Sequence, residues 1–276
     1  MKEAVVRANI ALHTALSETY DRDQPHYRPE NRASVSRRLA RLAGAAGSDR
    51  LVDFGCGSGF VIGLARPYFR EIVGVDVTPA MLRRVDRSAG GVAVLQASTE
   101  AVPLRAETAN VVAANSFLHH LFDVQPSIQE AYRLLKPGGV FYSEEDPNRD
   151  FWEAMKALAQ EDAPAGPAPS EAVRREVTAV MDTARAIESQ QGVEAHLVEL
   201  AEYQKMKLGG MRARDLERVF RQAGFSRIDI EHYWYLGQAS VLHRSEQASA
   251  EIETHLRLML PLSRHLFKYL RIEAWK

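Results

Sequence analysis

The feature that most constrains the fold of this chain is a regular alternation of short apolar runs with helical segments between residues 50 and 143. Strands that are connected through helices lie parallel, in a sheet that helices cover on both faces. The alternation therefore predicts an α/β fold with a doubly wound, mostly parallel sheet. Five runs have the length and apolar content of buried strands: residues 50–54, 71–77, 92–96, 109–114 and 140–143.

The remaining length predicts additions around one core. An amphipathic helix is expected over residues 2–16, and two final strands at 227–232 and 235–241 bring the sheet to seven strands. Residues 1–49 then form an N-terminal helical segment that acts as a lid, and the core consists of residues 50–150 and 209–243. A helical cap insert covers residues 151–208, and a C-terminal helix covers residues 244–276.

Composition excludes several functional classes. The 276 residues include 35 Lys and Arg against 36 Asp and Glu, a formal net charge of −1 with no basic run, so a nucleic acid partner is not expected. Cys56 is the only cysteine, which excludes an intrachain disulfide and a cysteine-based zinc cluster. The first ten residues resemble neither a signal peptide nor a membrane anchor, so we expect a cytoplasmic protein without a membrane partner.

A glycine-rich turn follows the first predicted strand. Gly55, Gly57 and Gly59 would bring the backbone close to a ligand, and Asp76 ends the second strand about twenty residues later, where a carboxylate can accept ribose hydroxyls. A glycine run alone is also compatible with a tight structural turn. The third glycine comes one residue too early for nicotinamide binding, and Asp53 would repel a pyrophosphate but attract an ammonium group.

The run Val52-Asp53-Phe54-Gly55-Cys56-Gly57-Ser58-Gly59 resembles motif I of the class I S-adenosylmethionine-dependent methyltransferases, which have a Rossmann-like sheet. Four more motifs of that family follow in order, and the resemblance covers residues 20–146 and 216–241. The motifs are Gly74-Val75-Asp76-Val77-Thr78-Pro79-Ala80-Met81-Leu82, Ala97-Ser98-Thr99-Glu100-Ala101-Val102-Pro103-Leu104, Asn115-Ser116-Phe117-Leu118-His119-His120-Leu121 and Leu134-Leu135-Lys136-Pro137-Gly138-Gly139.

The resemblance implies S-adenosyl-L-methionine as cofactor and S-adenosyl-L-homocysteine as product. Ser98 stands where the family commonly has an aspartate that accepts from the adenine amino group; the Ser98 hydroxyl can still accept, and Glu100 is a substitute. The implied cofactor-binding residues are Tyr20, Tyr27, Asp53, Gly55, Cys56, Gly57, Asp76, Val77, Met81, Ser98, Thr99 and Asn115.

The candidate catalytic residues follow strands four and five of the expected sheet. His119 and His120 are candidate general bases, because histidine as a residue type titrates near neutrality, with helix capping or packing as the alternative. Glu145 is a third candidate, in an acidic run that lacks metal-ligand spacing, so no metal is expected. Because a sulfonium methyl group is already activated, the reaction can also proceed by proximity and exclusion of water alone.

Aromatic residues late in the chain are candidates for the substrate pocket. Tyr233 and Tyr235 share one face of an expected strand, while Tyr203 and Met206 lie late in the helical insert. For all four, packing in the core is the alternative. The expected acceptor is a small, largely apolar metabolite, as in natural-product biosynthesis, with carbon, oxygen or nitrogen as the methylated atom.

Other functions are also compatible with these motifs. A protein or RNA acceptor is one alternative, and a nicotinamide-dependent oxidoreductase is a weaker one because of the glycine spacing. The helix over residues 2–16 is expected either to cover the active site or to exchange with a neighbouring subunit in a homo-oligomer.

Overall fold

The computed structural model describes residues 1–23, 27–88, 90–160 and 169–276. Residues 24–26, 89 and 161–168, which belong to the expected N-terminal segment, core and insert, lie outside the described part. Within the described ranges, no helix combines the length and apolar character needed to cross a bilayer.

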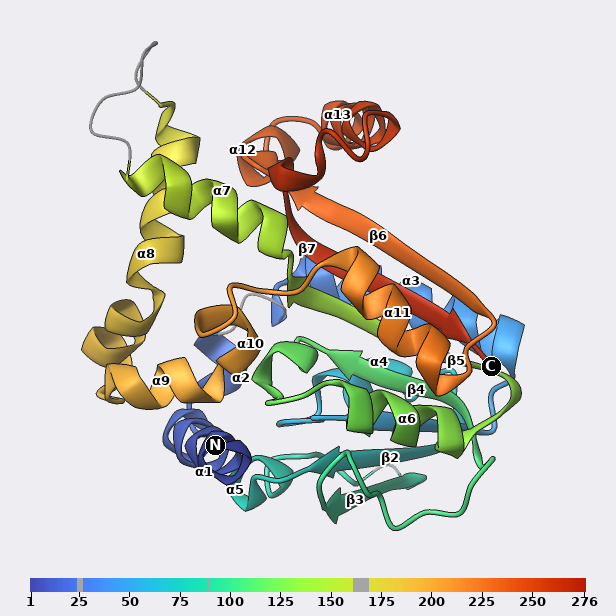
Figure 1. The fold of residues 1–276 in the computed structure, drawn as a ribbon. Helices are drawn as coiled ribbons and strands as arrows, with labels where there is room; N and C mark the ends of the chain where they lie inside the picture. The colour runs from blue at the N-terminus through green and yellow to red at the C-terminus, as the bar shows by residue number, and fades with distance from the viewer. Residues whose placement is uncertain (24–26, 89, 161–168) are drawn as a thin grey trace.

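The centre of the molecule is a seven-stranded sheet with the order β3-β2-β1-β4-β5-β7-β6 (Figure 1). The first five strands in this order pair in parallel, and β7 pairs antiparallel with both of its neighbours. The mostly parallel, seven-stranded α/β fold is therefore confirmed. The strands are β1 (Arg50–Phe54), β2 (Glu71–Asp76), β3 (Val92–Gln96), β4 (Ala109–Asn115), β5 (Leu135–Pro147), β6 (Arg227–Tyr235) and β7 (Phe267–Trp275).

Helices cover both faces of the sheet. On one face, α3 (Pro29–Ala46) and α4 (Phe60–Ala65) bury apolar side chains such as Leu39 and Ile62 against the strands. On the other face, α6 (Gln125–Leu134) and α11 (Ala213–Ala223) do the same with Ile128 and Phe220. Such burial contributes roughly 1.5–3 kcal/mol for each large apolar side chain, so the two layers hold the strand ends in fixed positions.

A helical cap lies beside the carboxyl ends of the strands (Figure 1). Helix α1 (Lys2–Leu16) has the range that the sequence predicts, and its Leu12 and Leu16 pack against Val198 and Ala201. The cap therefore joins the first residues of the chain to an insert far away in sequence. Its other elements are α2 (Tyr20–Asp23), α7 (Arg149–Gln160), α8 (Glu171–Gln191), α9 (Ala195–Ala201) and α10 (Tyr203–Met206).

The C-terminal prediction was wrong in two places. The expected strand at 235–241 is instead the end of β6 followed by α12 (Gln238–Leu242), and the expected helix over 244–276 is limited to α13 (Glu246–Leu258). After the short turn η3 (Arg264–Leu266), the chain inserts β7 between β5 and β6. Leu270, Ile272 and Ala274 are all fully buried and recur at every second residue, which is the period of a strand.

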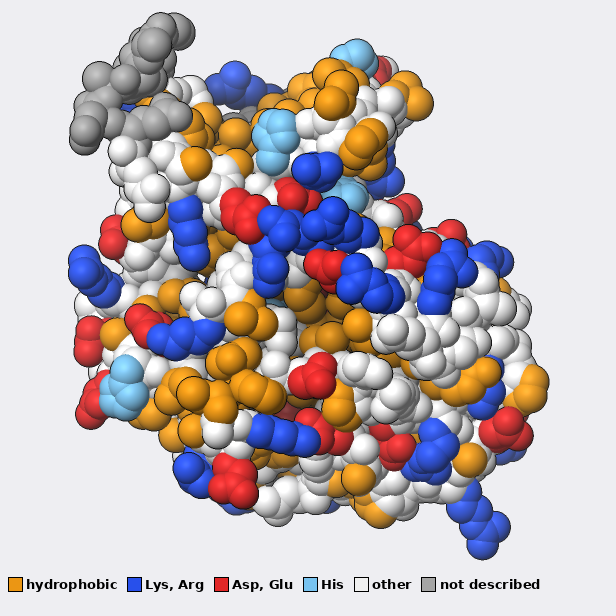
Figure 2. Space-filling view, viewed as in Figure 1, with side chains coloured by type: hydrophobic (Ala, Val, Ile, Leu, Met, Phe, Trp, Pro, Cys, Tyr) orange, Lys and Arg blue, Asp and Glu red, His pale blue; other side chains and the backbone are white. Residues whose placement is uncertain are grey.

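The pair α12–α13 stands away from the sheet, and hydrophobic side chains gather on its surface (Figure 2). Leu258, Met259 and Leu262, at the end of α13 and just after it, are exposed.

The connections leave β1 and β4 in opposite directions along the sheet, since β1 is followed by β2 on one side while β4 is followed by β5 on the other. Adjacent connections that diverge open a crevice beyond the carboxyl ends of the two strands, where ligands bind in folds of this type. The short turn η2 (Leu118–His120) follows β4 at this edge.

Candidate active site

The turn between β1 and α4 forms the floor of a first cavity at the crevice. Gly55 and Gly57 have φ of 65° and 52°, in the left-handed region that favours glycine. A Cβ on Gly55 would lie 2.0 Å from the ring of Phe117, so this position also excludes any side chain on steric grounds. The turn therefore packs tightly against Phe117, and both of its glycines line the cavity.

Two carboxylates face this cavity. The Asp76 oxygens accept hydrogen bonds from the backbone N–H groups of Gly57 (3.0 Å) and Thr78 (2.7 Å), which orients the side chain. Asp53 is 2% exposed, and its Oδ2 has no hydrogen-bond partner among the described atoms. Burial, and then the charge of Asp76, raise the pKa of Asp53 well above its usual range. A ligand that brings a cation or a hydrogen-bond donor would satisfy it.

Most residues that the sequence assigns to a cofactor meet at this cavity. Met81 instead packs beneath the turn, with its Cε 4.0 Å from the position of a Cβ on Gly57. The others all line the cavity: Tyr20, Tyr27, Asp53, Gly55, Cys56, Gly57, Asp76, Val77, Ser98, Thr99 and Asn115.

The loop expected to face the adenine is already engaged in hydrogen bonds. The Ser98 hydroxyl accepts from the Glu100 N–H (3.2 Å), and Thr99 Oγ1 lies 2.8 Å from Ser127 Oγ. The Glu100 side chain pairs with Lys2 of α1. The N-terminal helix is thus tied to the same loop, and Glu100 reaches the cavity only as half of an ion pair.

A second cavity of about 360 Å³ adjoins the first and shares four wall residues with it: His13, Tyr20, Ser116 and His120. Its other walls come from α1, β5, α7, α8, β7 and the residues around α10. The second cavity therefore exists only because the cap and the last strand meet the sheet edge.

Two of the three predicted catalytic residues are histidines, and both line the second cavity. His119 is buried, and its Nδ1 lies 3.0 Å from Asp146 Oδ1, which also accepts the His119 backbone N–H (3.1 Å). Asp146 in turn accepts a hydrogen bond from Ser143 Oγ. A carboxylate can only accept here, so Nδ1 carries the hydrogen and Nε2 is the basic nitrogen of the neutral ring.

His120 is held differently. Its Nδ1 donates to the Ala201 carbonyl oxygen (2.9 Å), and its ring lies 4.2 Å from that of His119 and 5.0 Å from that of His13, measured between centroids. Burial, followed by the neighbouring His119 and His13, lowers the pKa of His120 well below its usual value. His120 is therefore a neutral ring near physiological pH.

Glu145, the third predicted catalytic residue, also lines the second cavity. Its φ is 66°, an unusual value for a residue other than glycine, and its backbone N–H donates to Tyr233 Oη (2.7 Å). Burial raises the pKa of Glu145 to about 8, with further contributions from Glu144 and Asp146, while a hydrogen bond from Asn115 acts in the opposite direction. This carboxyl group can therefore exchange a proton near neutral pH.

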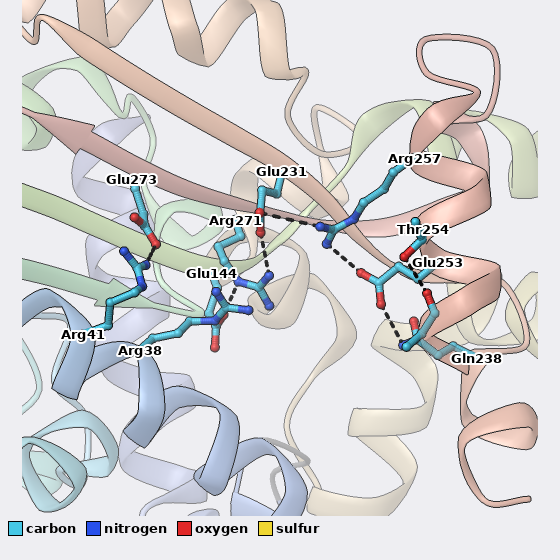
Figure 3. Close-up of polar contacts among 11 residues, drawn as sticks. Arg38, Arg41, Glu144, Glu231, Gln238, Glu253, Thr254, Arg257, Arg271 and Glu273 are labelled. Carbon is cyan, nitrogen blue, oxygen red and sulfur yellow. Dashed lines mark hydrogen bonds and ion pairs between the residues drawn. The ribbon is translucent and has the colours of Figure 1, made fainter. Parts of the chain in front are cut away.

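The adjacent Glu144 belongs to a separate ion-pair network (Figure 3). Arg271 Nε donates to Glu144 Oε2 at 2.6 Å, and Arg38 lies 3.6 Å from the same oxygen. Arg271 continues to Glu231, which pairs with Arg257 of α13. Glu144 is thus neutralised within the protein, so of the two neighbouring glutamates only Glu145 contributes to the cavity.

The four predicted substrate residues do not line either cavity among the described walls. Tyr203 packs on Phe122 with ring centroids 5.0 Å apart, and Met206 packs inside the cap. Tyr233 lies behind Glu145, and Tyr235 is buried with its Oη 3.5 Å from Ser249 Oγ. For these four residues, the structure agrees better with packing in the interior than with a role as walls of the substrate pocket.

Sequence reasoning missed several wall residues of the second cavity, including His13, Trp152 and Tyr269. The signal for Tyr269 was present, since it belongs to the strand-like run Phe267–Trp275. For His13 and Trp152 no local signal exists, because each is one residue on an amphipathic helix whose packing partner is remote. Across the described residues, His, Cys, Asp and Glu do not form a group of three that could hold a metal ion.

Known methyltransferases are similar to this chain. A sequence family described as "Methyltransferase domain" matches residues 52–143. A malonyl-[acyl-carrier protein] O-methyltransferase of Enterobacter lignolyticus is 33% identical over 129 residues, 46% of this chain and 51% of that protein. A probable S-adenosylmethionine-dependent methyltransferase of Mycolicibacterium smegmatis is 28% identical over 84% of this chain and 79% of its own length.

Residues 52–143 therefore match a methyltransferase domain, and most of the chain is similar to a probable S-adenosylmethionine-dependent methyltransferase. A solved structure with the same fold is Haemonchus contortus phosphoethanolamine N-methyltransferase 2, with a TM-score of 0.57 and 15% identity, covering 100% of this chain and 59% of that one. The chain spans about half the length of the curated relatives that match its core, as the 51% coverage of the Enterobacter protein shows.

The first cavity of the methyltransferase fits the family's cofactor, S-adenosylmethionine. The unpartnered Oδ2 of Asp53 suits the ammonium of the methionine part, and Gly55 and Gly57 line the same cavity. Asp76, oriented by two N–H groups, suits the ribose hydroxyls. Asn115 Oδ1 is a second buried oxygen without a partner in the same cavity.

Proposed function

We propose that this methyltransferase transfers a methyl group from S-adenosylmethionine to a small metabolite with an apolar part, bound in the second cavity, as in natural-product biosynthesis. The observation that carries this proposal is the contact between the two cavities. They share His13, Tyr20, Ser116 and His120, so only one layer of side chains separates the cofactor from the acceptor.

The size and walls of the second cavity support a small acceptor. Its volume of about 360 Å³ lies in the range of sites for small ligands. Leu12 and Leu16 of α1 and Val180 and Ile187 of α8 provide apolar surface across from the polar edge of the sheet. A cavity that is walled by helices on its outer side favours a compact molecule over a polymer.

The residues around the two cavities then have separate roles. The cofactor supplies an activated methyl group on a positively charged sulfur. Asp53 and Asp76 hold the cofactor, and the cap excludes water from the acceptor. His119, with its Nδ1 hydrogen held by Asp146, accepts the proton that an acceptor N–H or O–H must lose. Glu145 adds a carboxyl group with a pKa of about 8 to the same wall.

Two measurements test the proposal. Calorimetric titration should show binding of S-adenosylmethionine and none of NAD. An assay with methyl-labelled cofactor should then show transfer to members of a metabolite panel that includes a malonyl thioester, since one relative is named for that acceptor. Absence of S-adenosylmethionine binding would contradict the cofactor assignment. Transfer only to RNA or to a protein would contradict a small-molecule acceptor.

A further inference from the structure

One short segment lies between the two cavities. Residues 116–122, the dividing segment, follow β4 and supply walls to both cavities. The position of the dividing segment therefore sets where cofactor, candidate base and acceptor lie relative to one another. Its described wall residues are Ser116 and His120 for both cavities, His119 for the second only, and Phe117, Leu121 and Phe122 for the first only.

The sheet holds the first half of the dividing segment. The Ser116 N–H donates to the Glu144 carbonyl oxygen (2.8 Å). The His119 N–H donates to Asp146 Oδ1 (3.1 Å). Both acceptors belong to β5, so the core of the fold fixes this half of the segment.

The cap holds the second half of the dividing segment. Asn9 Nδ2 of α1 donates to the His120 carbonyl oxygen (3.1 Å). Gln204 Nε2 of α10 donates to the carbonyl oxygens of Leu121 (3.1 Å) and Phe122 (2.8 Å). Three consecutive carbonyl groups thus accept hydrogen bonds from two side-chain amides that are remote in sequence. Such partners matter because a buried backbone group without one costs free energy comparable to a lost hydrogen bond.

Gln204 contributes two of these three contacts. Its side chain is 8% exposed, and it is not among the described wall residues of either cavity. A change at Gln204 therefore acts on the reaction through the residues that it holds. Asn9 differs in this respect, because it also lines the first cavity and a change there would act on the cofactor directly.

We propose that Gln204 is a positioning residue for methyl transfer, which holds the dividing segment in the place that the reaction needs. The inference rests on the proposed function and deepens it, since it assigns alignment of the two cavities to a residue of the cap. When Gln204 loses its N–H donors, the carbonyl groups of Leu121 and Phe122 lose their partners. His119 and His120 then move with the backbone that carries them. A displacement of reacting groups by about 1 Å can lower a rate about 100-fold.

Gln204→Met tests this role, because methionine has a similar length but no N–H group. The assay measures transfer of labelled methyl from S-adenosylmethionine to the member of the metabolite panel that the unchanged protein methylates fastest. We expect kcat to fall roughly 30-fold and the KM for S-adenosylmethionine to change less than about threefold, since Asp53 and Asp76 stay in place. A kcat loss smaller than about fivefold overturns the proposal, and so does a loss that lies entirely in the KM for S-adenosylmethionine.

Gln238→Met is the matched control. Gln238 is equally buried, at 8% exposure, and its amide accepts from the Tyr235 N–H (2.9 Å) and donates to Glu253 (3.3 Å). None of these three residues is a described wall of either cavity. The control loses the same kind of side chain, so its kcat should stay within about twofold of the unchanged protein. Equal losses of kcat in both variants would show a general effect of lower stability and would overturn the proposal.

Amide hydrogen exchange reports on the dividing segment without an acceptor. In the complex with S-adenosylhomocysteine, a peptide covering residues 117–123 should exchange at least about tenfold faster in Gln204→Met than in the unchanged protein or in Gln238→Met. Equal exchange in the three proteins would show that Gln204 does not hold this segment and would overturn the proposal. If Gln204→Met does not fold, Gln204→Asn replaces it, because its amide is one methylene shorter and loses the two contacts, and the same outcomes decide.

The outcomes also separate the two proposals. If the unchanged protein binds no S-adenosylmethionine or methylates no member of the panel, the proposed function fails and the positioning role falls with it. If the unchanged protein is active and Gln204→Met keeps its kcat, only the positioning role fails.

Discussion

The two cavities of this methyltransferase differ in how the chain builds them. The first cavity comes mainly from the carboxyl ends of β1, β2 and β4 and the turns that follow them, and its key groups lie within short motifs. The second cavity takes its walls from α1, β5, α7, α8, β7 and the residues around α10, which span almost the whole chain. A cofactor shared by a family can thus keep a local site, while the acceptor site depends on how distant segments pack.

The comparison implies that single changes in the first cavity act on cofactor affinity, and that changes in the cap act on the acceptor. Five experiments test this division.

The largest effect is expected from Gly55→Ala. The left-handed backbone and the clash with Phe117 together cost the folded protein roughly 3 kcal/mol, and displacement of the turn that lines the first cavity should weaken S-adenosylmethionine binding roughly 100-fold. Calorimetry gives the affinity. Gly44→Ala is the control, because Gly44 lies in α3 with open space around it and should be neutral or stabilising. Equal affinities for both variants would argue against close approach of the cofactor at Gly55.

Removing residues 1–17 should lower kcat/KM for the acceptor on the order of 30-fold, because the second cavity loses the wall formed by Leu12, His13 and Leu16. S-adenosylmethionine affinity should fall less, because the first cavity loses its α1 wall, including Val5 and Asn9, but keeps the glycine turn and Asp76. Size-exclusion chromatography with light scattering reports the oligomeric state of the full-length and the truncated chain. A truncated chain with unchanged size and full activity would refute the covering role of α1.

Asp53→Asn should weaken S-adenosylmethionine binding roughly tenfold, since the carboxylate that faces the ammonium becomes neutral. Asp229→Asn is the control, because Asp229 is an exposed partner of Arg227 on the edge strand. If the two variants bind the cofactor equally well, Asp53 does not contact the methionine part.

The raised pKa of Glu145 makes stability depend on pH. The folded state holds a proton up to about pH 8, whereas an unfolded glutamate loses it near 4.5, so the free energy of unfolding falls as pH rises through this window. Between pH 7 and 9 the free energy of unfolding should fall by about 1 kcal/mol more for the native protein than for Glu145→Gln. Urea denaturation of both proteins at both pH values measures this difference. Equal losses of unfolding free energy in the two proteins would show that Glu145 is ionised already at pH 7.

The smallest effect is expected from Tyr233→Phe. Loss of the Oη that accepts the Glu145 N–H should loosen this residue and lower kcat roughly threefold, with the KM for S-adenosylmethionine unchanged. The alkaline limb of the pH–rate profile should also shift, a readout that packing alone would not move. Tyr235→Phe is the control, because the Tyr235 Oη lies 3.5 Å from Ser249 Oγ, whereas the Glu145 N–H donates to Tyr233.

The predictable part of the molecule is the part with local signals. Apolar runs at residues 50–54 and 71–77, with glycines between them, specify β1, the turn and β2, and eleven of the twelve expected cofactor residues meet at the first cavity. The run Phe267–Trp275 shows the limit, because its strand period was mistaken for the end of a helix. Tyr233 shows another, since a buried aromatic on a strand has the same pattern whether it lines a pocket or supports its wall.

The sequence by itself determined the doubly wound sheet, the position of the cofactor turn and the residues around it, because hydrophobic periodicity and glycine conformation are properties of neighbouring residues. Which side chains line the second cavity depends on the packing of distant segments. His13 joins His119 and His120 because α1 packs on α9, and Asp146 orients His119 because β4 and β5 end side by side. Contacts between segments that are separated along the chain leave no pattern in either segment alone, so packing assigns these roles.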